Sequence, residues 1–170
     1  MQKTNMALLA LASGLACAQA QAGNWVVRVD GAGPLKIGMK FDTVNRVLGD
    51  HMERTPPPLR ANGNCFYVRP ADDPSLLLMF VDDVLRRVDA VEEGSASERG
   101  VAVGDSVEKV RQIYGEAVKD EPSAYDASEH YLTVHTGGGQ YALRFETSKG
   151  RISALYAGDW RQVQWTEGCS

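Results

Sequence analysis

The chain of 170 residues is long enough for a single domain, and its 18 basic and 22 acidic residues give a formal net charge of −4. A mildly acidic chain without a cluster of lysines and arginines argues against nucleic-acid binding, because phosphates attract concentrated positive charge. We therefore expect no nucleic-acid partner, and a basic protein surface is the easier one for this chain to bind.

The first 22 residues have the features of a secretory signal peptide. Lys3 supplies a positive charge, residues 6–18 are apolar, and two overlapping small-x-small cleavage sites lie within residues 18–22. No later stretch is apolar over the roughly 20 residues that a membrane-spanning helix needs. We expect an exported, periplasmic protein without a transmembrane segment.

Residues 25–29 are expected to form a short strand that ends at a turn rich in glycine and proline. A helix is expected over residues 41–48, because apolar residues recur there at i, i+3, i+6 and i+7. Gly49 is well placed to end this helix, since glycine tolerates the left-handed conformation common just past a helix end.

A polar connection at residues 51–64 contains three consecutive prolines, which cannot continue a helix. Three strands are expected after it, at residues 65–69, 76–81 and 84–91. The next segment, residues 92–100, is rich in Glu, Ser and Gly and predicts a linker.

The second half of the chain repeats the pattern of the first. Residues 38–49 align without a gap to residues 104–115, at an offset of 66 positions (104 minus 38). The repeated positions are core and turn residues, so they describe a fold and not a chemistry. We expect an α+β fold of two tandem helix-plus-antiparallel-sheet repeats, residues 23–94 and residues 95–170 with the C-terminal tail, packed as one body.

The second repeat is expected to begin its helix with a better cap than the first. Asp105 or Ser106 can cap it, and Asp105 with Glu108 fits a capping box, whereas Met39-Lys40 offers no equal cap. The elements expected in this repeat are a helix over 107–114 and strands over 130–136, 140–146 and 151–156.

Removal of a signal peptide would leave two of the three cysteines, Cys65 and Cys169. In an oxidising compartment such a pair usually forms a disulfide, and no Cys-x-x-Cys motif indicates a reactive thiol. We predict a bridge from the C-terminal tail to the first strand after the proline-rich loop. The alternative of a lipid anchor on Cys17 is disfavoured by Gly14, because a leucine usually precedes such a cysteine by three residues.

No catalytic or metal-binding motif is recognisable. His130 and His135 are five apart on a predicted strand, so they point to opposite faces and cannot readily share a metal. The sequence has no His-Glu-x-x-His, Gly-x-Ser-x-Gly, phosphate-binding glycine loop or dinucleotide fingerprint. We therefore expect a non-catalytic protein with no cofactor and no metal.

Alternation along the predicted strands separates a core face from an open face. If the sheets of the two repeats lie side by side, their open faces form a broad polar and aromatic surface. The side chains expected to bind a target there are Tyr67, Arg69, Tyr131, Thr133, His135 and Arg144.

Two further features have alternative interpretations. The turn Gly104-Asp105-Ser106 can insert a carboxylate and a hydroxyl into another protein's cleft, or it can simply cap the following helix. Trp25, Trp160 and Trp165 can form a sugar-stacking or protein-contact surface, or they can seal sheet edges and the seam between repeats.

The doubled motif resembles the tandem repeats of β-lactamase inhibitory protein. It consists of Gly33-Pro34-Leu35-Lys36-Ile37-Gly38-Met39, a helix ending in glycine, and strands with Arg-Val-x-Ala or Arg-Ile-x-Ala. A single copy is similar to BamE, a small outer-membrane assembly lipoprotein. The resemblance covers most of residues 33–158 and implies a concave protein-binding sheet surface, with loops that reach into a target enzyme's active site. The disulfide layout departs from that inhibitor.

The expected export and doubled architecture also look like periplasmic immunity proteins of type VI secretion amidase effectors, in which a serine-bearing loop blocks the catalytic cleft. That resemblance implies this part for Ser106. We expect an inhibitor or immunity protein that binds a secreted or periplasmic enzyme, with a peptidoglycan hydrolase or amidase favoured over a β-lactamase. The alternatives are a BamE-like scaffold of the bacterial outer envelope and a carbohydrate binder that uses its tryptophans.

Overall fold

A computed structural model describes residues 25–60, 62–136 and 138–170. The predicted signal peptide and Cys17 lie outside this part of the chain. The described residues form a mixed α+β fold with a small three-stranded sheet and a seven-stranded antiparallel sheet. Within these ranges, no helix combines the length and apolarity needed to cross a membrane.

The small sheet is a tight meander of β1 (Val27–Arg28), β2 (Gly31–Ala32) and β3 (Leu35–Lys36). The expected opening strand is therefore shorter than predicted. The guanidinium of Arg28 donates to the carbonyl oxygens of Gly33 and Leu35, at 3.1 Å each, which fastens the second turn.

Both predicted helices are present, as α1 (Phe41–Val47) and α2 (Val107–Tyr114). Their apolar stripes face the core, where one continuous cluster contains residues from the helices and from both sheets. Gly49 follows α1 with a φ of 81°, and Gly115 ends α2 with a φ of 57°. A glycine with positive φ therefore follows each helix, as predicted, although the ψ of Gly115 is −135° and not that of a left-handed helix.

The large sheet has the order β4-β5-β6-β10-β9-β8-β7, and all its neighbours are antiparallel. Because β6 pairs with β10, strands from the two halves of the chain form one sheet. Six of the strands were predicted; β5 has the predicted bounds, and the ends of the other five differ by at most three residues. Their bounds are β4 (Cys65–Val68), β5 (Leu76–Val81), β6 (Val84–Ala90), β7 (Val118–Pro122), β8 (His130–His135), β9 (Tyr141–Ser148) and β10 (Arg151–Asp159).

Neither β7 nor the short helix α3 (Trp160–Val163) was predicted. The edge strand β7 lies in the polar segment after α2 and pairs with β8 from Val118 to Pro122. The helix α3 follows β10 and packs against β6, β9 and β10. Two short 3-10 helices, η1 (Pro57–Leu59) and η2 (Gly115–Ala117), complete the fold.

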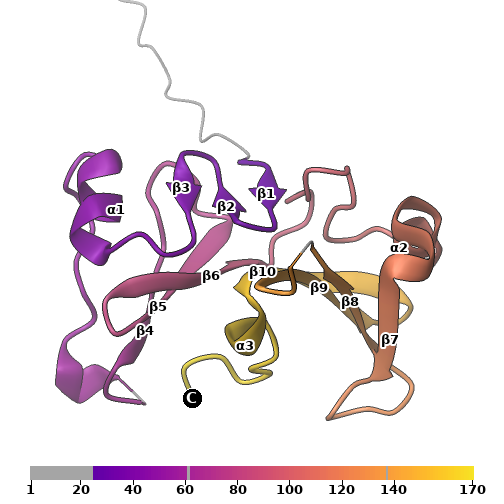
Figure 1. Cartoon of the computed structure of the whole chain (residues 1–170). Helices are drawn as coiled ribbons and strands as arrows, with labels where there is room; N and C mark the ends of the chain where they lie inside the picture. Colours follow the sequence, from indigo (N-terminus) through magenta and orange to yellow (C-terminus); the bar gives the residue numbers. More distant parts are fainter. Residues whose placement is uncertain (1–24, 61, 137) are drawn as a thin grey trace, which may run out of the picture.

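The two faces of the large sheet have different covers. Figure 1 shows α1, α2 and the small sheet on one side, and α3 with the C-terminus on the other. We call residues 160–170 the C-terminal tail, and we call the sheet face on which they lie the tail face. The face predicted to be open is therefore covered at its centre.

Candidate functional site

Three of the side chains predicted to bind a target lie on the tail face but are largely inaccessible. Thr133 is fully buried, and Tyr131 and Arg144 are each 5% exposed. The Nε of Arg144 donates to the Oγ1 of Thr133 at 3.0 Å, and its guanidinium lies 4.9 Å from the centre of the Tyr131 ring. Burial lowers the pKa of Arg144 below its ordinary value.

Of the other predicted side chains, His135 lies on β8 with Thr133, whereas Tyr67 and Arg69 are on and just after β4, beyond the C-terminal tail. Tyr67 is half-buried on β4, whereas Arg69 and His135 are exposed. Arg69 donates to the carbonyl oxygen of Pro74, and the ring of His135 lies 4.0 Å from that of Trp160. The expectation of one open surface needs correction, because the tail lies between Tyr67 on β4 and the side chains on β8 and β9.

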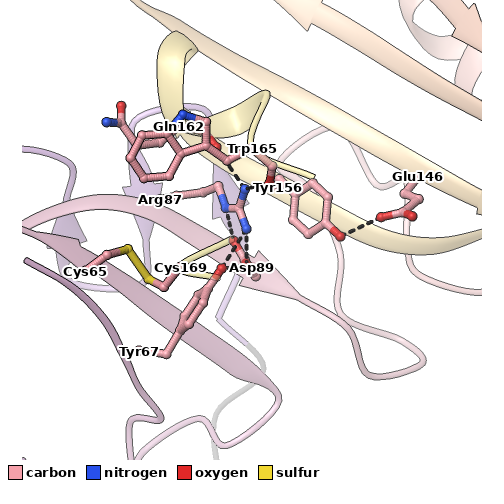
Figure 2. Close-up of polar contacts among 9 residues, drawn as sticks. All are labelled: Cys65, Tyr67, Arg87, Asp89, Glu146, Tyr156, Gln162, Trp165 and Cys169. Carbon is pink, nitrogen blue, oxygen red and sulfur yellow. Dashed lines mark hydrogen bonds and ion pairs between the residues drawn. A yellow bond between two sulfur atoms is a disulfide. The ribbon is translucent and has the colours of Figure 1, made fainter. Parts of the chain in front are cut away.

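The centre of the tail face is a buried ionic cluster that we did not predict. Arg87 and Asp89 are i and i+2 on β6, so both point to the tail face, and they are 2% and 4% exposed. The Nε of Arg87 donates to Asp89 Oδ1 at 2.6 Å, and Nη2 donates to Asp89 Oδ2 at 2.8 Å. Figure 2 shows this bidentate pair between the disulfide and Tyr156.

The remaining donors of Arg87 bind the tail and a tyrosine. Its Nη1 donates to the carbonyl oxygens of Gln162 and Trp165, at 2.8 and 2.7 Å, and Nη2 donates to the hydroxyl of Tyr67 at 2.7 Å. All five N–H groups of the guanidinium are therefore used. Arg87 fastens the backbone of the C-terminal tail to the middle of the sheet (Figure 2).

Two tyrosines complete the cluster as hydrogen-bond donors. The hydroxyl of Tyr67 donates to Asp89 at 2.9 Å, and that of Tyr156 donates to Glu146 at 2.5 Å. Burial raises the pKa of both tyrosines well above its ordinary value, so both stay protonated. Burial also raises the pKa of Asp89, an effect that Arg87 opposes. Because the polar groups of the cluster form hydrogen bonds with one another, we assign the cluster a structural role.

The predicted disulfide is a second fastening for the tail. Cys65 on β4 is bonded to Cys169, 104 positions further along the chain. Both cysteines are buried, in a small apolar cluster with Met79 and, at its margin, Trp165. The prediction of this bridge is confirmed, and such a bridge is compatible with an extracytoplasmic location.

The turn Gly104-Asp105-Ser106 begins α2 and uses its polar groups locally. Ser106 is the N-cap, and its Oγ accepts from the amide of Lys109 at 3.3 Å. The Asp105 carboxylate accepts from the amide of Ala102 at 2.6 Å and from Lys109 Nζ at 2.7 Å. Ser106 is the cap, one of the two predicted candidates, whereas the predicted capping box of Asp105 with Glu108 does not form.

This turn is not combined with the other predicted target-binding residues. It belongs to α2, whose apolar stripe packs on the core side of the large sheet, whereas Thr133 and Arg144 lie on the tail face. At α1 the equivalent cap position, Lys40, makes no side-chain capping bond, as the sequence predicted. Insertion of Ser106 into a target's cleft stays a prediction.

The Asp105 contacts predict a pH-dependent stability difference. Burial acts to raise the pKa of Asp105, but hydrogen bonds from Lys109 and Ala102 outweigh it and lower the pKa. A carboxylate with a lowered folded-state pKa stabilises the protein above the unfolded value of about 3.9, and this stabilisation is lost as pH falls through the folded value. We expect Asp105→Asn to cost less than about 1 kcal/mol at pH 7 and still less at pH 2. Urea unfolding at both pH values tests this, and an equal cost at both would contradict it.

The tryptophans divide between two roles. Trp25 packs against the main core, close to Gly33 of the small sheet. Trp160 and Trp165, both in the C-terminal tail, line a cavity of about 600 Å³ beside α3. Among the described residues, no three His, Cys, Asp or Glu side chains are grouped to hold a metal ion.

We compared the chain with protein-family models, with curated proteins and with solved structures. None of these comparisons found a match.

Proposed function

We propose that this chain is an exported, non-catalytic protein that binds a secreted or periplasmic enzyme and blocks its active site, as an inhibitor or immunity protein. A peptidoglycan hydrolase or amidase is favoured over a β-lactamase, because the disulfide layout departs from that of β-lactamase inhibitory protein. The proposal rests on the tail face, where the Arg87 contacts and the disulfide hold the C-terminal tail in one position in the absence of a partner. A pre-ordered surface loses little conformational freedom on binding.

The proposal includes two tandem repeats, and the contacts of the two turns before the helices support them. The amide of Gly38 donates to Leu85, and the amide of Leu85 donates to Met39, at 2.8 and 2.9 Å. In the second half, the amide of Gly104 donates to Ile152, and the amide of Ile152 donates to Asp105, at 2.8 Å each.

The centre of the large sheet supports a twofold relation between the repeats. Asp89 of β6 pairs with Tyr156 of β10, and the strand order runs outward from this pair as β6-β5-β4 and β10-β9-β8. Each central strand has a register shift at the matching place, at Arg86 and at Ser153. Because Leu85 and Ile152 make equivalent contacts, they correspond to each other in the two repeats. Alignment of Arg-Val-x-Ala with Arg-Ile-x-Ala instead matches Arg87 to Arg151, which differs from this correspondence by three positions.

Two exposed apolar tips define where a partner would bind. Leu59 at the end of η1 is 74% exposed, and Tyr125 in the loop after β7 is 62% exposed. Figure 1 shows both segments extending on the same side of the large sheet as α3, one on each side of the tail. A concave face between two projecting loops would accommodate a convex part of a partner.

The charge near one tip supports a basic partner. The hydroxyl of Tyr125 donates to Glu167 of the tail at 2.9 Å, and Asp126 is the next residue in the loop. Tyrosine is enriched at the centres of protein interfaces, and acidic groups around it favour a positively charged partner.

The test is to replace the two tips and measure affinity for the enzyme that the protein inhibits. We expect Leu59→Ser and Tyr125→Ala each to weaken the complex by about tenfold or more. The melting temperature should change little, because exposed substitutions usually cost within about 0.5 kcal/mol. Binding is measured by biolayer interferometry and inhibition by residual enzyme activity.

Two variants serve as controls. Val47→Ser removes a comparably exposed apolar residue from α1, on the other side of the sheet, and should leave affinity unchanged. Ser106→Ala should cost about 1 kcal/mol of stability through loss of the cap, and its affinity distinguishes the tail face from the turn before α2 as the binding site. If Ser106→Ala abolished binding while both tip variants bound normally, the turn before α2 would be the binding site and the tail face would not.

A further inference from the structure

A cavity of about 600 Å³ lies between α3, the turn after β5 and the start of β9. Its volume is within the range of about 300–1,000 Å³ typical of small-molecule sites. Its walls include two aromatic rings and side chains that can donate or accept hydrogen bonds. The residues that matter here are Asp82, Gln140, Trp160, Arg161, Gln162 and Trp165.

Gln162 is the first indication that this cavity binds a ligand. The residue is only 8% exposed, and its backbone carbonyl accepts from Arg87. Its side-chain amide makes no hydrogen bond to any residue in the described part of the chain, and Figure 2 shows it directed away from the Arg87 guanidinium. The amide is not among the buried unpaired polar groups of the described residues, so its atoms reach the open space of the cavity and are available to a ligand there.

The other polar groups of the cavity carry balanced charge. Arg86 and Asp159 form an ion pair at 3.0 Å, and Arg161 and Asp82 are exposed. Because two guanidinium groups face two carboxylates, the cavity favours neither an anion nor a cation. It offers donors and acceptors together, which suits a hydroxyl group because each hydroxyl both donates and accepts.

The two tryptophans supply an apolar component beside these groups. Trp160 and Trp165 are each half-buried, so part of each indole is covered by protein and part is open. An indole ring is flat and largely apolar, and it can pack on the C–H face of a pyranose ring. From this combination we infer that the cavity beside α3 binds a neutral oligosaccharide. The inference does not depend on the proposed inhibition of an enzyme.

The experiment titrates the full mature protein with chitotetraose and cellotetraose and measures heat and tryptophan fluorescence. A Trp25→Phe background removes the emission of the tryptophan outside the cavity. We expect saturable binding of at least one of the two sugars. Trp160→Ala and Gln162→Leu should each weaken it about tenfold or more, while tetragalacturonate and tetraalanine bind less well than the preferred neutral sugar.

Three further variants separate a lost contact from a lost fold. Gln112→Leu makes the same change on the exposed side of α2 and should bind like the parent. Trp160→Phe keeps a ring and should retain part of the affinity. Arg161→Ala changes an exposed side chain, so it should weaken binding without lowering the melting temperature.

Three results would overturn the inference. The first is no heat and no fluorescence change with either neutral sugar up to about 10 mM. The second is unchanged affinity in Trp160→Ala, Gln162→Leu and Arg161→Ala. The third is tighter binding of tetraalanine than of either sugar, which would make the cavity a peptide site.

Discussion

Replacing Arg87 with methionine is expected to lower the free energy of unfolding by about 3–5 kcal/mol. The change leaves the carboxylate of Asp89 buried without its bidentate partner, and it removes the side-chain donor that ties the carbonyl oxygens of Gln162 and Trp165 to the sheet. Methionine has a similar length and no charge, so the loss reports the ionic cluster more than a cavity. Urea unfolding followed by circular dichroism measures the effect.

The neighbouring arginine provides a matched control. Arg86 forms a partly exposed ion pair with Asp159, with 36% and 18% of the two side chains exposed. Arg86→Met is therefore expected to cost less than about 1 kcal/mol. Changing Arg87 and Asp89 together, to methionine and leucine, should recover part of the loss, because no charge is left buried. Equal effects of the two single arginine variants would contradict a special role for Arg87.

Removal of the disulfide is expected to cost about 4 kcal/mol, measured with the double variant Cys65→Ala, Cys169→Ala. The bridge joins residues 104 positions apart, so in the unfolded chain it closes a long loop and removes much conformational entropy. Its loss should lower the midpoint of urea unfolding. Limited proteolysis should also cleave the C-terminal tail sooner, because the covalent bond that holds its end to β4 is gone.

Reducing agent gives the control for this prediction. It should shift the unfolding midpoint of the parent protein to that of the double variant, and it should leave the double variant unchanged. A parent protein whose stability does not respond to complete reduction, confirmed by thiol titration, would show that the Arg87 contacts hold the tail without help from the bridge.

Regular periodicity explains which elements could be predicted. The stripes of α1 and α2 recur at helical spacing, and six strands of the large sheet alternate or are continuously apolar, so local sequence was sufficient. The strand β7 is Val118-Lys119-Asp120-Glu121-Pro122, a polar run whose extended form depends on pairing with β8. The helix α3 has four residues, too few for a periodic pattern.

The cover on the tail face could have been foreseen from the predicted disulfide. Cys65 alternates onto the same face as Tyr67, so a bridge to Cys169 must bring the end of the chain across that face. The predicted bridge and the predicted open surface are therefore incompatible at the centre of that face. The burial of Thr133 and Arg144 has a further cause, because the two side chains bond each other across neighbouring strands.

The ionic cluster had a weaker signal in the sequence. Arg87 and Asp89 are two apart on β6, so they lie on one face of the strand, where a buried charged pair needs further hydrogen-bond partners. What the sequence does not reveal is that the partners are backbone carbonyls of the tail. Every residue has a backbone carbonyl, so no pattern of residue types identifies these partners.

The fixed position of the chain end has a practical consequence for handling the protein. Because Cys169 is bonded to β4, a purification tag or fluorophore fused after Ser170 would emerge beside the surface proposed for the partner. Such a fusion would compete for space with any bound enzyme and would report a falsely weak affinity. A label on an engineered cysteine at Arg46, exposed on α1 across the sheet, would avoid this artefact.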